Sequence, residues 1–451
     1  MRPLFRISSS CVAALAMLAF LVTLTAAAGG QSENVLYSFT DAGDGASPFG
    51  NLVADSRGNY FGTTPVGGSY AGVCQYNGCG NVFELSPNGS GGWVETVLYD
   101  FTGGADGAGP EAGLTFDGAG NLYGTTTDGG NLSNTNCGLI TAGCGVVFKL
   151  SPNGDGTWTE SVLYAFQGKH DGFLPQSTVS FDAAGNLYGA ADLGGAGYGT
   201  VFQLSPNGSG GWTFNLIHAF TNGVDGGRPA ALIVDGHGNL FATTTQGGKI
   251  TNICRSGCGS LIEFSPNGSG GWTPHLLHDF TGAKDGGVPW GISLDANGNL
   301  FGSALYGGNS GCSGGEYPGC GVIFEFSPVS GGGWSPHIPY SFTGANDGGG
   351  PQAPLAFDTA GNVYATSNVA TDHSCPGSCG AIVKLTPSGG SWSETTLYTF
   401  TGATDGAEPV NNGVILDASG NLFGTTQFGG TDSCYIGGLI NGCGVVFEIK
   451  P

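Results

Sequence analysis

The sequence predicts an all-β protein, a seven-bladed β-propeller built of four-stranded blades. Three observations indicate this fold: a recurring turn, a recurring set of strands, and a repeat that is divided between the two ends of the chain. The turn is seen at Leu114–Thr127, where two apolar runs flank Asp117-Gly118-Ala119-Gly120-Asn121. Glycine and asparagine tolerate the positive φ angles that tight hairpin turns require. The pattern occurs seven times, with its aspartate at Asp55, Asp117, Asp182, Asp235, Asp295, Asp358 and Asp417.

Each repeat contains four strand candidates, which we expect to form one blade. In the second repeat, strands a to d are Leu114–Asp117, Leu122–Thr127, Val146–Ser151 and Trp158–Phe166. Strand c recurs as V-F-E-L-S-P at Val82–Pro87 and in six similar versions. Successive turn aspartates are 53 to 65 residues apart, a spacing typical of propeller blades with long loops. A solenoid suits the sequence less well, because no capping repeats are visible.

The two ends of the chain carry complementary parts of one repeat. Val35–Phe39 has the pattern of a d strand, and Val445–Lys450 has that of a c strand. We expect the first strand to complete the last blade and close the ring, which leaves no free sheet edge. Strand a then lines the central channel, and the d–a and b–c loops share one face.

Residues 1–28 are predicted to be a signal peptide and residues 29–451 a single propeller domain. Arg2 and Arg6 precede an apolar run at Cys11–Thr25, and Ala26–Ala28 offers a small-residue cleavage site. The run is shorter than the ~20 residues of a membrane span. We therefore expect a secreted, periplasmic or cell-surface protein with no membrane span in the mature chain. The net charge of −22 at pH 7 marks an acidic protein and disfavours nucleic acid as a partner.

Twelve further cysteines form six close pairs, each in a b–c loop. Paired cysteines in an exported chain are typical of disulfides, whereas a zinc site would need two pairs to meet. The third blade has no pair, and its loop, Asp192–Gly199, is short. The predicted disulfides join Cys74 to Cys79, Cys137 to Cys144, Cys254 to Cys258, Cys312 to Cys320, Cys375 to Cys379 and Cys434 to Cys443.

The recurring motifs F-T-G-A-x-D-G-x-x-P, D-x-x-G-N-L-Y-G-T-T and C-G-V-V-F-x-L-S-P resemble the GloVer tandem repeat, the Gloeo–Verruco repeat of exported bacterial proteins. The resemblance covers the whole mature chain in seven copies. It implies export, and it brings no established activity and no catalytic residues.

A second aspartate recurs in the d–a loops, followed by glycine and, four positions after the aspartate, by proline. A ring of these carboxylates would bind Ca²⁺ at the channel mouth, although calcium prefers six to eight oxygen ligands. The alternative, which we favour, is that each aspartate caps the backbone of its own turn. The residues are Asp44, Asp106, Asp171, Asp225, Asp285, Asp347 and Asp405.

A single ligand site should depart from the sevenfold pattern, because a feature present in every blade serves the blade. Five basic residues, a histidine and two large aromatic residues fall in loops of the third to fifth blades, on one face. We predict that they bind an anionic or carbohydrate ligand, with Trp290 stacking on a sugar. Local ion pairs with neighbouring aspartates are the alternative. The residues are Lys169, His170, Phe173, Arg228, Lys249, Arg255, Lys284 and Trp290.

The sequence contains no Gly-rich phosphate loop or H-E-x-x-H motif, and we assign no catalytic residues. We expect a non-catalytic binding or interaction propeller, whose partner is a carbohydrate, an anionic molecule or another exported protein. Two alternatives stay open: a metal-assisted lyase or lactonase-like hydrolase acting at the channel mouth, and a structural envelope component.

Overall fold

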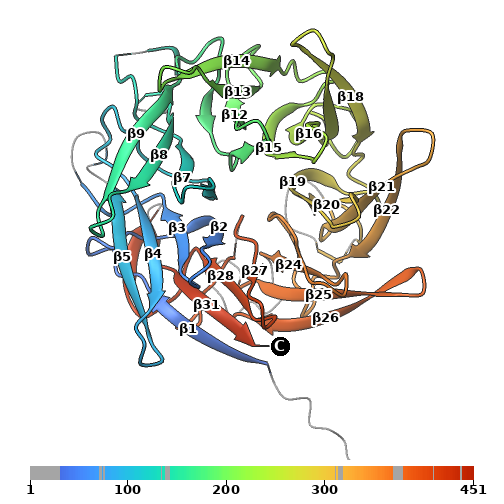
Figure 1. The fold of residues 1–451 in the computed structure, drawn as a ribbon. Coiled ribbons are helices and arrows are strands. Elements are labelled where there is room, and N and C mark those ends of the chain that lie inside the picture. The colour runs from blue at the N-terminus through green and yellow to red at the C-terminus, as the bar shows by residue number, and fades with distance from the viewer. Residues whose placement is uncertain are drawn as a thin grey trace, which may run out of the picture.

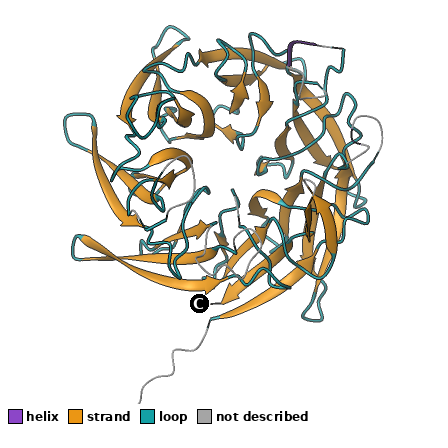
Figure 2. Cartoon of the chain, turned by 180° about the vertical axis from the view of Figure 1, so that it is seen from behind, coloured by secondary structure: helices purple, strands orange, loops and turns teal. Residues whose placement is uncertain are grey.

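The computed structural model describes residues 31–70, 74, 77–133, 135–137, 143–309, 311–312, 318–368, 379–409, 411–436 and 439–450. Seven antiparallel sheets are arranged in a ring around a central axis (Figure 1), which confirms the predicted seven-bladed propeller. Figure 2 shows the ring from behind, built of strands and their connecting loops with a short helical segment. No helix among the described residues is long and apolar enough to cross a membrane. The predicted signal peptide lies outside these residues.

Each blade runs from an inner strand to an outer strand. The first three blades are β2 (Phe49–Ala54), β3 (Tyr60–Thr64), β4 (Asn81–Pro87), β5 (Trp93–Asp100); β6 (Thr115–Phe116), β7 (Leu122–Thr126), β8 (Val146–Pro152), β9 (Trp158–Ala165); and β10 (Phe173–Pro175) with β11 (Ser180–Phe181), β12 (Leu187–Leu193), β13 (Thr200–Pro206), β14 (Trp212–Ala219). The next three are β15 (Gly227–Val234), β16 (Leu240–Gln246), β17 (Ser260–Pro266), β18 (Trp272–Asp279); β19 (Gly287–Leu294), β20 (Leu300–Tyr306), β21 (Val322–Pro328), β22 (Trp334–Ser341); and β23 (Ala356–Phe357), β24 (Val363–Ser367), β25 (Ala381–Ser388), β26 (Ser391–Thr399). The seventh is β27 (Ile415–Leu416), β28 (Leu422–Thr426), β31 (Val445–Lys450) and β1 (Ser32–Ser38).

The seventh blade joins the two ends of the chain, as predicted. β1 pairs antiparallel with β31, from Ser32 opposite Lys450 to Ser38 opposite Val445. In Figure 1 these two strands, blue and red, lie side by side at the rim of the ring. Two features were not predicted. In the third blade the inner strand is divided into β10 and β11, and the b–c loop of the seventh blade contains the hairpin β29 (Ser433–Ile436) and β30 (Leu439–Gly442).

The hydrophobic core lies between the blades. Each of the seven buried clusters among the described residues combines side chains of two neighbouring blades. The cluster that closes the ring places Phe39 beside Phe83 of the first blade, and Phe423 of the seventh blade belongs to the same cluster. Each blade therefore depends on both neighbours to bury its apolar faces.

The recurring D-G-x-x-P motif fastens each blade to the one before it, a contact we call the latch. In the latch that closes the ring, the N–H of Ser47 donates to the carbonyl of Cys443 at 2.8 Å. Pro48 packs against Gly444, where a Cβ atom would come within 2.5 Å of the proline Cδ. The same N–H···O=C bond is formed by Gly109 to Cys79 at 2.9 Å and by Val288 to Cys258 at 2.7 Å.

The latch needs a left-handed backbone at the residue before the proline. This residue is glycine at Gly109 and Gly350, but five blades hold other residues there with φ between 54° and 58°. They are Ser47, Leu174, Arg228, Val288 and Glu408. Because the left-handed region is unfavourable for residues with a Cβ atom, and most of all for β-branched residues, these five latches hold local strain.

We expect Val288→Gly to stabilise the protein by about 1 kcal/mol, since glycine adopts this backbone conformation without strain. Thermal unfolding monitored by circular dichroism measures the effect. Gly109→Val provides the reciprocal control and should lower the melting temperature, because it adds strain and places a Cβ atom 2.7 Å from the Thr127 hydroxyl. A Val288→Gly protein that melts below the wild type would contradict the strain argument.

Candidate functional site

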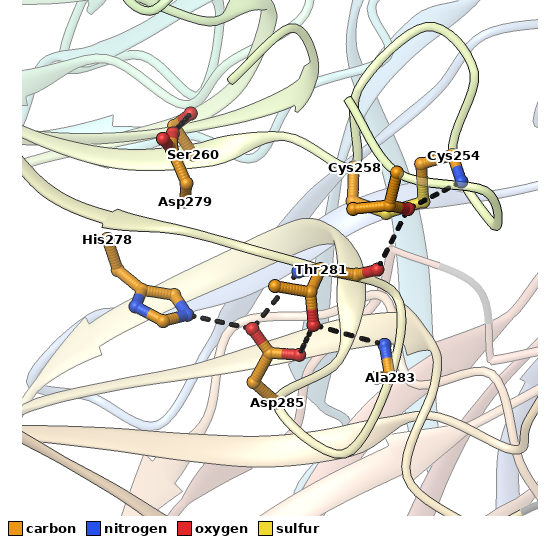
Figure 3. Close-up of polar contacts among 9 residues, drawn as sticks. Cys254, Cys258, Ser260, His278, Asp279, Thr281, Ala283 and Asp285 are labelled. Carbon is orange, nitrogen blue, oxygen red and sulfur yellow. Dashed lines mark hydrogen bonds and ion pairs between the residues drawn. A yellow bond between two sulfur atoms is a disulfide. The ribbon is translucent and has the colours of Figure 1, made fainter. Parts of the chain in front are cut away.

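The loop between β18 and β19 shows how the recurring aspartate is held (Figure 3). Asp285 Oδ2 accepts hydrogen bonds from the Thr281 N–H and from His278 Nε2, both at 3.0 Å, and Oδ1 accepts one from the Thr281 hydroxyl. Burial alone would raise the pKa of Asp285, but the hydrogen bonds from His278 and Thr281 outweigh burial and lower it. The carboxylate therefore stays ionised and caps its own turn.

Five other loops repeat this arrangement, with a threonine hydroxyl bonded to Oδ1 of the aspartate four positions later. The pairs are Thr40/Asp44 at 2.9 Å, Thr102/Asp106 at 2.6 Å, Thr221/Asp225 at 2.5 Å, Thr343/Asp347 at 2.6 Å and Thr401/Asp405 at 2.5 Å. Within the described ranges, no three His, Cys, Asp or Glu side chains gather as metal ligands. Calcium binding at the loop aspartates stays a prediction.

A cavity of about 380 Å³ lies in the central channel, lined by the beginnings of the inner strands. Six of its lining residues directly follow the latch proline of their blade: Phe49, Glu111, Gln176, Ala230, Trp290 and Gln352. The seventh equivalent, Val410, lies outside the described residues. The latch is shared by the blades, whereas the side chain that follows it differs from blade to blade. This ring of positions, the channel mouth, is therefore where the molecule departs from its sevenfold pattern at a cavity.

The cavity at the channel mouth contains two polar atoms that have no protein partner among the described residues. Trp290 Nε1 is a buried donor without an acceptor, and Asn411 Oδ1 is a buried acceptor without a donor. Both residues line the same cavity. Buried polar atoms without partners are rare in native proteins, and a hydroxyl group can bond to either kind of atom. These two atoms therefore favour a hydroxyl-rich ligand.

Glu111 places one carboxyl group in the cavity. Its Oε2 accepts a hydrogen bond from Gln176 Nε2 at 2.7 Å. Burial raises the pKa of Glu111 to about 7, and the charges of Asp128 and Asp192 add to this effect, while the bond from Gln176 opposes it. Near neutral pH this carboxyl can therefore both donate and accept hydrogen bonds.

A second cavity of about 600 Å³ lies at the outer rim between β9 and β14, and we call it the outer hollow. Lys169 and His170 line it together with Tyr164, Asp171 and Phe214. Both Lys169 and His170 are exposed. The predicted ligand-binding residues are thus divided between two places, since Trp290 lines the channel mouth instead.

The other predicted ligand-binding residues lie in neither cavity. Arg228 forms an ion pair with Asp192 at 2.5 Å, which is the kind of local pairing that we considered as the alternative. Phe173 packs against the cluster that joins the second and third blades. Lys249, Arg255 and Lys284 are exposed on their loops. For all eight residues, ligand binding stays a prediction.

Five of the six predicted disulfides have both cysteines among the described residues. In each of these five pairs the Cα atoms are 5.0 to 5.2 Å apart, a distance typical of disulfides. Figure 3 shows one of the pairs at its place in the b–c loop. The five are Cys74 with Cys79, Cys137 with Cys144, Cys254 with Cys258, Cys312 with Cys320, and Cys434 with Cys443.

The sixth predicted disulfide differs, because only one of its two cysteines lies within the described residues. Cys379 is buried at the start of its strand. Its predicted partner, Cys375, lies outside the described residues, so the bond between Cys375 and Cys379 stays a prediction.

The second cysteine of each pair lies directly beside a latch. The carbonyl of Cys320 accepts the latch bond of the Gly350 N–H at 2.8 Å, and that of Cys379 accepts the bond of the Glu408 N–H at 3.1 Å. Cys144 precedes Gly145, where a Cβ atom would lie 2.8 Å from the Cδ of the latch proline Pro175. The third blade offers Tyr198 in place of a cysteine, and its carbonyl accepts the latch bond of Arg228 at 2.7 Å.

Sequence reasoning identified Trp290 but missed Phe49, Glu111, Gln176 and Gln352. The signal was available, because all of them follow the proline of the D-G-x-x-P motif. Aligning the loops on this proline, which all seven share, shows that the residue after it differs between blades. Asn411 could not be found in this way, since its loop has an extra residue before the next turn aspartate.

Comparison with known proteins finds a family model and distant structures. Residues 135–314 match the Gloeobacter/Verrucomicrobia repeat, and no curated protein matches the chain. A gluconolactonase from Xanthomonas campestris is 15% identical, with a TM-score of 0.41, over 75% of this chain and 87% of that protein. A luciferin-regenerating enzyme is 14% identical, with a TM-score of 0.43, over 75% of this chain and 90% of that protein. At these values neither likeness bears on function. The part of the chain at residues 135–314 matches the Gloeobacter/Verrucomicrobia repeat, which agrees with the family that the sequence motifs resemble.

Proposed function

We propose that this chain is an exported, non-catalytic propeller that binds a carbohydrate in the channel mouth. The observation that carries the proposal is the pair of unpartnered atoms, Trp290 Nε1 and Asn411 Oδ1, in a cavity whose described lining breaks the sevenfold pattern. Sugar hydroxyls would satisfy both atoms, and the aromatic rings of Trp290 and Phe49 offer surfaces for the apolar face of a sugar. Cysteine pairs at disulfide distance support export.

A neutral sugar suits the channel mouth better than an anion. Glu111 is the only acidic or basic residue that lines the described cavity. A carboxyl group repels an anionic ligand when it is ionised, whereas sugar hydroxyls can bond to it in either protonation state. The anionic ligand that the sequence also suggested therefore finds no support at this cavity.

Trp290→Ala is expected to weaken carbohydrate binding about tenfold or more, because large aromatic side chains dominate binding energy where they are desolvated. A panel of labelled mono- to tetrasaccharides identifies the sugar, and titration followed by intrinsic fluorescence or calorimetry measures the affinity. Trp290→Phe keeps a ring but removes Nε1, so it separates stacking from hydrogen bonding. Equal affinity of the wild type and Trp290→Ala, or no sugar bound by the wild type, would refute the proposal.

Glu111 favours one alternative, a hydrolase or lyase at the channel mouth. A carboxyl group with a pKa of about 7 can act as a general acid or base at neutral pH. Chromatography of the sugar after prolonged incubation distinguishes the two functions. Turnover by the wild type and binding without turnover by Glu111→Gln would establish catalysis in place of binding alone.

A further inference from the structure

The outer hollow breaks the sevenfold pattern at a buried carboxylate. Six d–a loops place threonine four residues before the aspartate, but the loop between the second and third blades has Gln167. Asp171 Oδ2 still accepts hydrogen bonds from the Tyr164 hydroxyl at 2.6 Å and the Gln167 N–H at 2.8 Å. The Gln167 side chain bonds elsewhere, donating to the Ala165 carbonyl at 2.8 Å and accepting from Asn131 at 3.2 Å.

Asp171 Oδ1 is therefore left without the hydroxyl that its equivalents bind. The residue is only 7% exposed, and this oxygen has no partner among the described residues. A buried carboxylate oxygen without a donor costs free energy. Asp171 also lines the outer hollow, so a hydroxyl from a bound molecule can replace the missing threonine hydroxyl.

The outer wall of the hollow also departs from the other blades. Phe214 stands opposite Leu204 of the neighbouring strand, whereas Glu95 and Glu160 occupy this position opposite Leu85 and Leu150. The Phe214 and Tyr164 rings stack with centroids 4.4 Å apart and an interplanar angle of 18°. The substitution replaces a carboxyl group by an apolar ring at this interface.

The charges of the hollow suit an acidic ligand. Asp171 is the only carboxylate in its described lining, and Lys169 and His170 are exposed beside it. Leu216, which is 46% exposed, extends the apolar wall. A molecule that fits has a hydroxyl group to donate, an apolar face and a negatively charged group near the lysine. Sugar acids of the hexuronate class combine all three features.

We propose that the outer hollow is a second binding site, distinct from the channel mouth, which takes a hexuronate residue of an acidic polysaccharide. A sugar hydroxyl donates to Asp171 Oδ1, the ring packs against Phe214 and Leu216, and the carboxylate pairs with Lys169. The site is independent of the proposed function, because none of its residues lines the channel cavity.

Gln167→Thr tests the site by restoring the hydroxyl that six other loops have. The probe is a glucuronate disaccharide, with the corresponding glucose disaccharide as the neutral arm. We expect the wild type to bind the acidic probe at least about tenfold more tightly than the neutral one, as a charge-assisted pair predicts. Gln167→Thr should lower the affinity for the acidic probe by about tenfold. The melting temperature of this variant should be equal to or above that of the wild type. Saturation-transfer NMR and calorimetry measure binding.

Three further variants keep the test decisive. Lys169→Ala should abolish the preference for the acidic probe, whereas Lys284→Ala removes a cation from a loop with an intact threonine–aspartate pair and should leave it unchanged. Trp290→Ala should also leave this binding unchanged, which separates the outer hollow from the channel mouth. Undiminished binding to Gln167→Thr, or no binding of either probe to the wild type, overturns the proposal.

Discussion

Removing residues 31–39 should open the propeller and lower its unfolding free energy by about 5 kcal/mol or more. The deletion takes away β1, which forms the outer strand of the seventh blade through its pairing with β31. It also removes Phe39, which is fully buried in the cluster that joins the seventh and first blades. The edge of β31 would then be free to pair with other chains.

Chemical denaturation measures the loss of stability, and light scattering measures association of the shortened chain. Phe101→Ala is the matched control, because Phe101 is buried in the first blade as Phe39 is in the seventh, while the ring stays closed. It should cost about 3–5 kcal/mol without causing association. A shortened chain that remains monomeric and as stable as the wild type would contradict closure by β1.

Raising the pH from 5 to 8 should destabilise the protein, because carboxyl groups face each other between the blades. Glu33, Glu95 and Glu160 lie on outer strands, and each has a buried Oε1 without a partner among the described residues. Burial raises the pKa of each to about 7, and the charges of Asp405, Asp44 and Asp106, respectively, add to it. These are loop aspartates of the preceding blade.

The direction of this pH effect follows from a comparison with the unfolded chain, in which a glutamate side chain has a pKa of about 4.5. Since the folded pKa is higher, the stability contributed by the protonated groups is complete below about pH 4.5. It is lost as the pH rises through about 7. After allowance for solvent screening at these half-exposed groups, we expect about 1 kcal/mol from each. On the acid side, the lowered pKa values of Asp225 and Asp285 have the opposite effect, and stability falls below about pH 4.

Thermal unfolding across this pH range, at constant ionic strength, measures the effect. A triple variant with Glu33, Glu95 and Glu160 changed to Gln should be more stable than the wild type at pH 8 and should flatten the profile, because an amide resembles the protonated acid. Glu263→Gln is the control, since that carboxylate accepts hydrogen bonds from Ser265 and Trp334. An unchanged slope in the triple variant would refute the explanation.

The fold could be predicted from the sequence because its signals are local and repeated seven times. A hairpin turn such as Asp117–Asn121 needs only five neighbouring residues, and the pairing of β1 with β31 followed from counting strands. The divided inner strand of blade three and the β29–β30 hairpin have no counterpart in other repeats, so the repeat pattern could not predict them.

The candidate sites were harder to predict, because they depend on contacts between blades. Glu95 and Asp44 are about fifty residues apart in sequence, and only the ring brings their charges together. Lys169 and Trp290 stood out in the sequence as departures from the repeat, but the sequence did not show that one lines the outer hollow and the other the channel cavity. The sequence shows that Gln167 replaces the threonine of the other d–a loops. The consequence of this replacement became clear only from the structure, in which those threonine hydroxyls bond to Oδ1 of the loop aspartate.

The absence of a cysteine pair in the third blade has a consequence for how the ring responds to its surroundings. In latches such as those of Ser47, Gly109 and Val288, the accepting carbonyl belongs to a cysteine, so the redox state of the thiols acts directly on the joint between blades. The joint that rests on Tyr198 has no such dependence. Thiol reductants would therefore weaken the latches of the ring unevenly, and the latch between the third and fourth blades would be unaffected by them.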